Sequence, residues 1–165
     1  MTTLLVTLLA AALCHGAVVA SLLLGSWAAV VPSIGLVCVV IVGRRSPPGR
    51  VRAVALAAGL VAGTLLEGGL LALPLVYIGL ALIASTSRLV LPLESARSLL
   101  LVGCAFAILE TLLVLAFGIR GAGVMLTGEA WAFATAGILL TGVAFALAEM
   151  IVDRAPRLRH ALERP

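Results

Sequence analysis

Long apolar runs, interrupted by short stretches that carry most of the charged residues, constrain this sequence more than any other feature. The runs cover residues 1–43, 53–87, 98–119 and 130–152. A helix rises about 1.5 Å per residue, so about 20 apolar residues cross a hydrocarbon core about 30 Å thick. A helix also bonds its own backbone polar groups, for which lipid offers no partners. The runs therefore predict membrane-spanning helices.

The composition favours one integral membrane domain over the whole of residues 1–165. Hydrophobic residues make up 63% of the chain and charged residues 11%, whereas soluble domains have roughly 25% charged residues. The eleven basic residues are all arginine and give a net charge of +4, but they lie in the gaps between apolar runs. The sequence therefore predicts contacts with membrane lipids and no binding of nucleic acid.

The number of crossings follows from the length of each run. The last two runs hold one span each, and the first, broken at Gly25-Ser26-Trp27, holds two. The second run is ambiguous, because its length suits one long tilted helix, two short spans, or a span and a re-entrant segment. Gly68, Gly69 and Pro74 interrupt its middle and favour two spans.

The arginines give an independent test of this count, because cytoplasmic loops carry an excess of basic residues. Six spans with a cytoplasmic amino terminus place ten of the eleven arginines in the cytoplasm and leave Arg120 outside. The sequence thus predicts an all-α integral membrane protein, a compact bundle of six transmembrane helices with both termini cytoplasmic. The predicted spans are residues 3–24, 27–43, 53–70, 73–88, 98–119 and 131–152, followed by a cytoplasmic tail at 153–165.

No motif of a catalytic or cofactor site stands out. The sequence has no Walker loop and no HExxH or GxSxG motif, and its three cysteines are isolated within apolar runs. An intramembrane enzyme would need an activated nucleophile, and none is evident. We therefore expect a protein that is not an enzyme, with no catalytic residues, no metal and no cofactor.

Two glutamates within apolar runs, Glu67 and Glu110, are the main candidates for a polar site. A carboxylate inside hydrocarbon costs roughly 2 to 4 kcal/mol unless it is paired or protonated, so both are expected to face protein. Gly59 and Gly63 precede Glu67 at intervals of four residues, which places two small residues and the carboxylate on one helix face. Binding of an ion, a proton or a polar ligand is one interpretation. The other is a structural role, in which the carboxyl group extends to the membrane interface or caps a neighbouring helix, while the glycines allow close helix packing.

His15 and Pro32 complete the set of candidate polar or interface residues. His15 lies in the middle of the first predicted span, where it either pairs with a glutamate or forms a hydrogen bond within the bundle. Pro32 lies early in the second span.

Residues 32–83 carry an ordered set of features. Pro32-Ser33 opens an apolar span, a basic turn follows at Arg44-Arg45, then come Gly59, Gly63 and Glu67-Gly68, and a second apolar run begins near Pro74-Leu75. This order resembles the family of the rod shape-determining protein MreD. That family usually has Asp or Asn after the proline and Asp as the intramembrane acid, so Ser33 and Glu67 depart from its pattern, while Glu110 matches an acid common in a later span.

The resemblance implies a scaffold of the cell-wall elongation machinery in the bacterial inner membrane. Such a scaffold binds MreC through its transmembrane part, links to the RodA glycosyltransferase and its class B penicillin-binding protein, and reaches MreB filaments indirectly. Membrane folds of this family are also similar to the substrate-binding subunits of energy-coupling-factor vitamin transporters. The alternative is therefore a small transporter or vitamin-capture subunit that uses the intramembrane glutamates.

Overall fold

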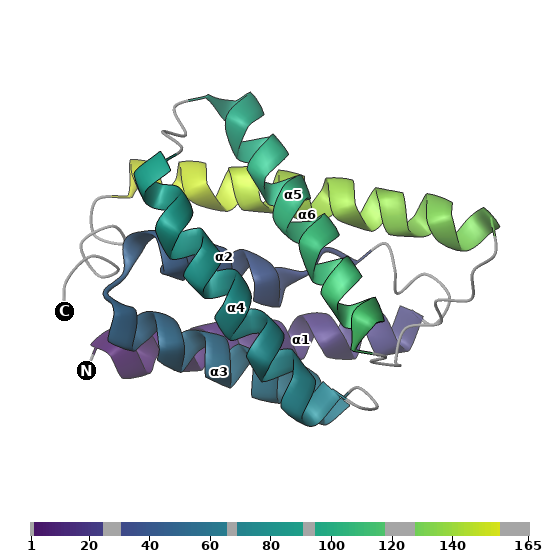
Figure 1. Cartoon of the computed structure of the whole chain (residues 1–165), viewed down its shortest axis with the longest axis horizontal. Helices are drawn as coiled ribbons and strands as arrows, with labels where there is room; N and C mark the ends of the chain where they lie inside the picture. The colour runs from purple at the N-terminus through teal and green to yellow at the C-terminus, as the bar shows by residue number, and fades with distance from the viewer. Residues whose placement is uncertain (1, 25–30, 66–68, 91–94, 118–127, 156–165) are drawn as a thin grey trace.

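The structure, a computed structural model, describes residues 2–24, 31–65, 69–90, 95–117 and 128–155. The all-α prediction is confirmed for these residues, which form helices and no strand. The helices are α1 (Thr2–Leu24), α2 (Ile34–Arg45), α3 (Pro48–Leu65), α4 (Gly69–Val90), α5 (Ala96–Ala116) and α6 (Gly128–Arg154) (Figure 1). Each of them overlaps one of the six predicted spans.

Three of the helices contain stretches long and apolar enough to cross a membrane. These stretches are Gly69–Ser87 in α4, Ala96–Ala116 in α5 and Ala132–Arg154 in α6, and α1 contains a shorter apolar stretch, Leu5–Ala17. By length and composition, the three helices support association with a membrane. Crossing by all six helices and cytoplasmic termini stay predictions.

Helix α2 differs most from the span predicted for it at residues 27–43. It begins at Ile34 and has 12 residues, which makes it about 18 Å long and shorter than a hydrocarbon core. Residues 31–33, directly before it, are not helical. Pro32 accounts for this start, because a proline disfavours helical geometry in the preceding residue and has no backbone N–H group.

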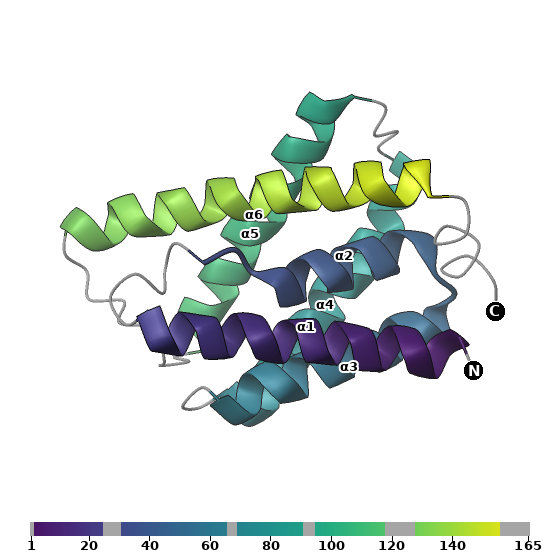
Figure 2. The same cartoon turned by 180° about the vertical axis from the view of Figure 1, so that it is seen from behind.

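The short helix α2 occupies the centre of the molecule. It packs against each of the other five helices, and in Figure 2 it lies between α1 and α6 with α4 crossing behind it. Its buried residues are Gly35, Leu36, Val37, Val39, Val40, Ile41, Val42 and Gly43. The hydrophobic core is therefore built around α2 and not around one of the three long apolar helices.

Glycines set the closest helix contacts. A Cβ atom added to Gly59 of α3 would lie 2.5 Å from the Pro74 Cα atom of α4, and one added to Gly63 would lie 2.5 Å from the Gly69 carbonyl oxygen. Ordinary contacts between carbon atoms are about 3.5–4.0 Å. The α3–α4 hairpin can therefore close only because these positions have no side chain.

The two ends of the described chain lie at the same end of the molecule. The start of α1 and the end of α6 are both at the left in Figure 1. Arg50, near the start of α3, belongs to this end and is only 2% exposed. Its Nε atom donates a hydrogen bond to the Thr3 Oγ1 atom of α1 over 3.2 Å, which ties these two helix starts together.

Candidate functional site

A cluster of hydrogen-bonded polar side chains lies inside the bundle, and we call Ser33, Tyr77, Glu110 and Thr141 the interior cluster. The Ser33 hydroxyl donates to the Glu110 Oε1 atom over 2.9 Å. The Ser33 backbone N–H donates to the Thr141 Oγ1 atom over 3.0 Å, and the Tyr77 hydroxyl is hydrogen-bonded to Glu110 and Ser33. The interior cluster therefore joins the start of α2 to α4, α5 and α6.

The local conformation at Pro32 makes Ser33 available to this cluster. Ser33 is the residue before α2, a position where a serine side chain commonly accepts a hydrogen bond from the first turn of its own helix. Here the side chain makes no such capping bond. Its hydroxyl group instead reaches Glu110, whose position in the sequence is 77 residues away.

Helix periodicity turns Glu110 inward. Gly103, Phe106 and Ala107, which precede it by seven, four and three residues, are the buried residues of the same face of α5. The opposite face is apolar and exposed, with Leu101 and Leu112 as examples. Glu110 itself is only partly exposed.

The electrostatics of the interior cluster depend on hydrogen bonds and not on ion pairs. Within the described residues, Arg44 and Arg45 form ion pairs with Glu149 and Asp153, whereas Glu110 forms no ion pair. The carboxylate instead receives hydrogen bonds from hydroxyl groups beside the N-terminal end of α2, where the helix dipole favours negative charge. These contacts offset part of the cost of placing a carboxylate in an apolar environment.

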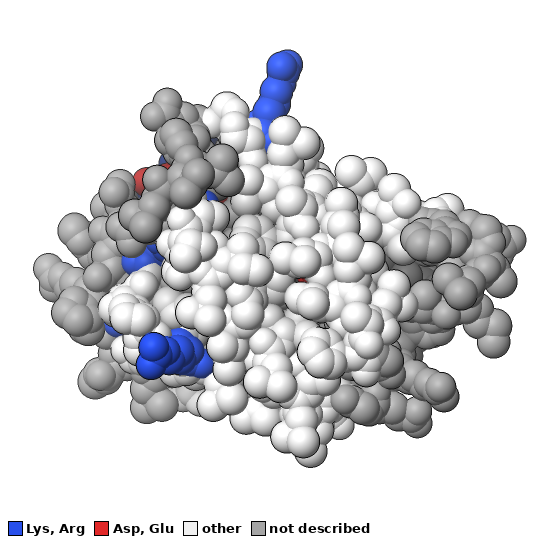
Figure 3. Space-filling model, in the orientation of Figure 1, with Lys and Arg blue, Asp and Glu red and all other residues white. Residues whose placement is uncertain are grey.

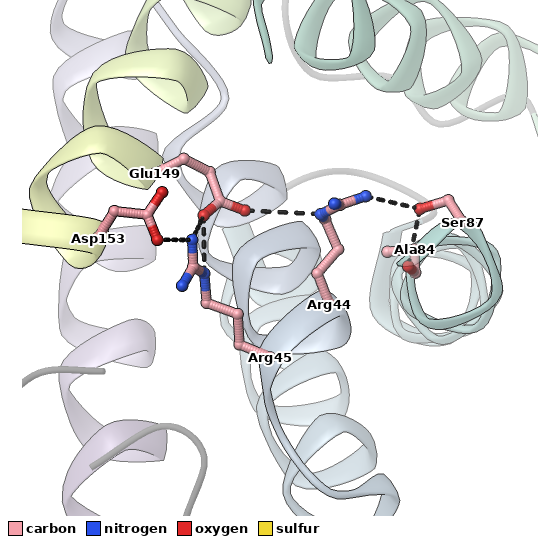
Figure 4. Close-up of polar contacts among 6 residues, drawn as sticks. All are labelled: Arg44, Arg45, Ala84, Ser87, Glu149 and Asp153. Atoms are coloured by element: carbon pink, nitrogen blue, oxygen red, sulfur yellow. Dashed lines mark hydrogen bonds and ion pairs between the residues drawn. The ribbon is translucent and has the colours of Figure 1, made fainter. Parts of the chain in front are cut away.

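A second polar cluster lies at the other end of α2, and we call Arg44, Arg45, Glu149, Asp153 and Ser87 the arginine cluster (Figure 4). Arg45 donates to the Glu149 Oε2 atom over 2.7 Å from Nε and makes a second, shorter contact with it. It also donates to the Asp153 Oδ1 atom over 2.8 Å. Arg44 lies 3.6 Å from the Glu149 Oε1 atom and donates to the Ser87 hydroxyl over 3.1 Å.

Arg44, Arg45 and Glu149 of the arginine cluster are largely withdrawn from solvent, whereas Asp153 is exposed. Glu149 is 2% exposed, so its carboxylate is neutralised by the two arginines and not by water. Partial burial disfavours the charged form of Arg45, but the hydrogen bonds and charges of Glu149 and Asp153 outweigh it and raise the pKa of Arg45 above its usual value. In Figure 3 blue side chains also project from the left end and the top of the molecule.

The residues predicted from sequence do not all come together. Glu110 is in the interior cluster, and Pro32 directly precedes Ser33, which supplies a hydrogen bond to it. His15 is exposed on α1, beside the buried Cys14. Glu67 lies outside the described residues, so the structure does not test its relation to Glu110.

Gly59 and Gly63 pack against α4 and take no part in either polar cluster. The sequence reasoning missed Ser33, Tyr77 and Thr141 as partners of Glu110. The signal for Tyr77 was available, because it is the single tyrosine of the chain and lies within an apolar run, where its hydroxyl needs a partner. In the described part of the chain, no group of three or more His, Cys, Asp or Glu side chains is placed to hold a metal ion.

The two clusters hold α2 in place at both of its ends. The interior cluster holds its start against α4, α5 and α6, and the arginine cluster holds its end against α4 and α6. Comparison with protein-family models, with curated proteins and with solved structures finds no match to this chain.

Proposed function

We propose that this chain is a non-enzymatic membrane scaffold of the MreD type in a bacterial inner membrane. The observation that carries the proposal is the interior cluster, whose polar groups bond to one another across four elements of the bundle. Intramembrane polar side chains used in this way hold helices together. The scaffold binds MreC through its transmembrane surface and links it to RodA, to the class B penicillin-binding protein and indirectly to MreB.

The arrangement of the helices supports a topology of six spans with both termini cytoplasmic. An even number of alternating crossings returns the chain to the side where it began, and the described chain starts and ends at the same end of the molecule. The arginine cluster and Arg50 belong to this end. Cytoplasmic loops are the ones that carry basic residues.

Helix α5 offers the surface best suited to a partner's transmembrane helix. Its exposed apolar side chains recur at intervals of seven, four and three residues and form one stripe: Leu101, Ile108, Leu112 and Leu115. This spacing is the one by which two helices pack along a shared seam. Of the three stretches long enough to span a membrane, α5 is also the least buried within the bundle.

Co-purification in mild detergent from the native host tests the scaffold function. The tagged protein is expected to bring down a cell-wall protein with a single transmembrane helix, identified by mass spectrometry. Exchanging Leu101 and Leu112 for alanine should reduce its recovery, whereas exchanging Leu9 and Leu13 on the exposed side of α1 should not. Recovery of an ATPase pair in place of a cell-wall protein refutes the scaffold.

The alternative function is capture or transport of a small molecule, and one observation favours it. Helix α2 is a half-length helix whose N-terminal end meets Glu110 inside the bundle. Interrupted helices of this kind form the binding sites of many transporters. In that case Glu110→Gln would abolish uptake of the molecule in vesicles and leave assembly with a cell-wall partner unaffected.

A further inference from the structure

Helix α1 leaves one of its faces uncovered by the rest of the chain. It packs against α2 and α3, and in Figure 2 it lies at the front of the molecule. Its inward face carries the buried Ala10 and Cys14. Ala12, two residues after Ala10, is turned about 200° away from it around the helix axis and is exposed. We call the exposed residues around it the outward face of α1: Leu5, Leu8, Ala12, His15 and Gly16.

His15 belongs to the outward face although it lies near the middle of the helix. It is about 20 Å along the axis from Thr2 and about 14 Å from Leu24. Among the described residues, its exposed side chain has no hydrogen-bond or ion-pair partner. With α1 crossing the membrane as proposed above, the imidazole ring stands deep in hydrocarbon. Ionisable side chains at that depth almost always face protein, so His15 requires a partner outside this chain.

Gly16 gives an independent indication of a partner at the same place. A Cβ atom added to Gly16 would have no other atom within 4 Å, so no contact among the described residues requires a glycine here. Glycine is less favourable than alanine inside a helix. Ala12 precedes Gly16 by four residues and is also exposed. Two small residues at this spacing allow two transmembrane helices to approach closely.

We propose that the outward face of α1 is the contact surface of a homodimer. Two α1 helices cross at Ala12 and Gly16, and the two His15 side chains are hydrogen-bonded to each other. This inference rests on the proposed crossing of the membrane by α1, and it adds a surface separate from the exposed stripe of α5.

The outward face is complementary to itself. Two copies in one membrane have the same orientation, so a twofold axis along the membrane normal places both His15 residues at the same depth. A neutral imidazole has one N–H donor and one acceptor nitrogen, so one ring can donate to the other. Leu5 and Leu8 lie on the same helix face as Ala12 and His15, at intervals of three, four and three residues, and extend the contact along α1.

The test measures self-association of the purified full-length protein in liposomes. Energy transfer between donor-labelled and acceptor-labelled copies, followed against the protein-to-lipid ratio, gives the dimerisation constant. Gly16→Ile should weaken dimerisation by roughly tenfold or more, because a large side chain holds the crossing helices apart. His15→Leu should weaken it by roughly threefold, the effect of one interhelical hydrogen bond. His15→Gln keeps a donor and an acceptor and should dimerise nearly as well as the wild type.

Gly79→Ile of α4 is the matched control. Gly79 also has no atom within 4 Å of an added Cβ, but Leu75 and Ile83, four residues to either side, are large. This variant should dimerise like the wild type, and circular dichroism shows whether each variant is folded.

Two results refute the homodimer. One is a wild type that stays monomeric at every protein-to-lipid ratio, which leaves the outward face to lipid or to a different protein. The other is a dimer that Gly16→Ile weakens no more than Gly79→Ile does. Neither result decides the scaffold function, because co-purification of a cell-wall protein is a separate measurement.

Discussion

The close approach of α3 and α4 makes a quantitative prediction for Gly59→Ala. The new methyl group would stand 2.5 Å from the Pro74 Cα atom and 2.7 Å from its nitrogen. Both are backbone atoms, so a change of side-chain rotamer cannot relieve the overlap. Restoring an ordinary contact distance of about 3.5–4.0 Å requires the two helices to separate by about 1 Å. Forcing extra volume into a packed interface typically costs about 1–3 kcal/mol.

Gly79→Ala provides the matched control, because Gly79 lies in the same hairpin and has no atom within 4 Å of an added Cβ. Both substitutions gain the same improvement in helix propensity, about 1 kcal/mol, which cancels when the two variants are compared. The expected difference of about 1–3 kcal/mol corresponds to a factor of roughly 5 to 150 in the unfolding equilibrium.

The assay is reversible unfolding of the purified protein in mixed micelles, with increasing mole fraction of sodium dodecyl sulfate and helicity as the signal. Gly59→Ala should unfold at a clearly lower mole fraction than Gly79→Ala. Equal midpoints for the two variants would show that the α3–α4 hairpin can separate without loss, and the reasoning from close packing would then be wrong.

Two further substitutions, each with a comparison variant, test the clusters at the ends of α2 in the same assay. Glu149→Ala leaves the two arginines at the end of α2 without their buried partner and should lower the free energy of unfolding by about 3 kcal/mol. Asp153→Ala, at a position 54% exposed, should lower it by less than about 1 kcal/mol. Equal losses of stability in the two variants would contradict the assignment of Glu149 as the buried partner. Thr141→Val removes the acceptor of the Ser33 backbone N–H group and should cost about 1–3 kcal/mol, more than Thr111→Val, whose hydroxyl bonds only within α5.

The sequence predicted the helical segments well because their signal is local. A run of apolar residues needs no knowledge of its neighbours to predict a helix. The division of the second run was predicted less well: α4 begins at Gly69, but Pro74, which was expected to interrupt the run, lies inside this helix. The start of α2 was harder to predict. The run of apolar residues continues on both sides of Pro32, so the pattern predicts a span from residue 27, whereas the helix begins at Ile34.

The contacts of Glu110 could be predicted only in part. Its cost in hydrocarbon predicts that it faces protein, and α5 does turn it toward the buried side. The identity of its partners depends on which helices become neighbours, because Ser33 and Tyr77 come from distant parts of the chain. Hydroxyl groups in apolar helices also commonly bond to their own backbone, as Thr111 does, so nothing local distinguishes those that bond elsewhere.

The central position of α2 has a consequence for biogenesis. As a 12-residue helix of about 18 Å, it is too short to be stable across a bilayer as an independent element. Partners at both of its ends, Thr141 and Glu149, belong to α6, which is synthesised after the other five described helices. The centre of the bundle is therefore completed only when α6 has been synthesised, and a chain that stops after α5 has a core that is not yet formed.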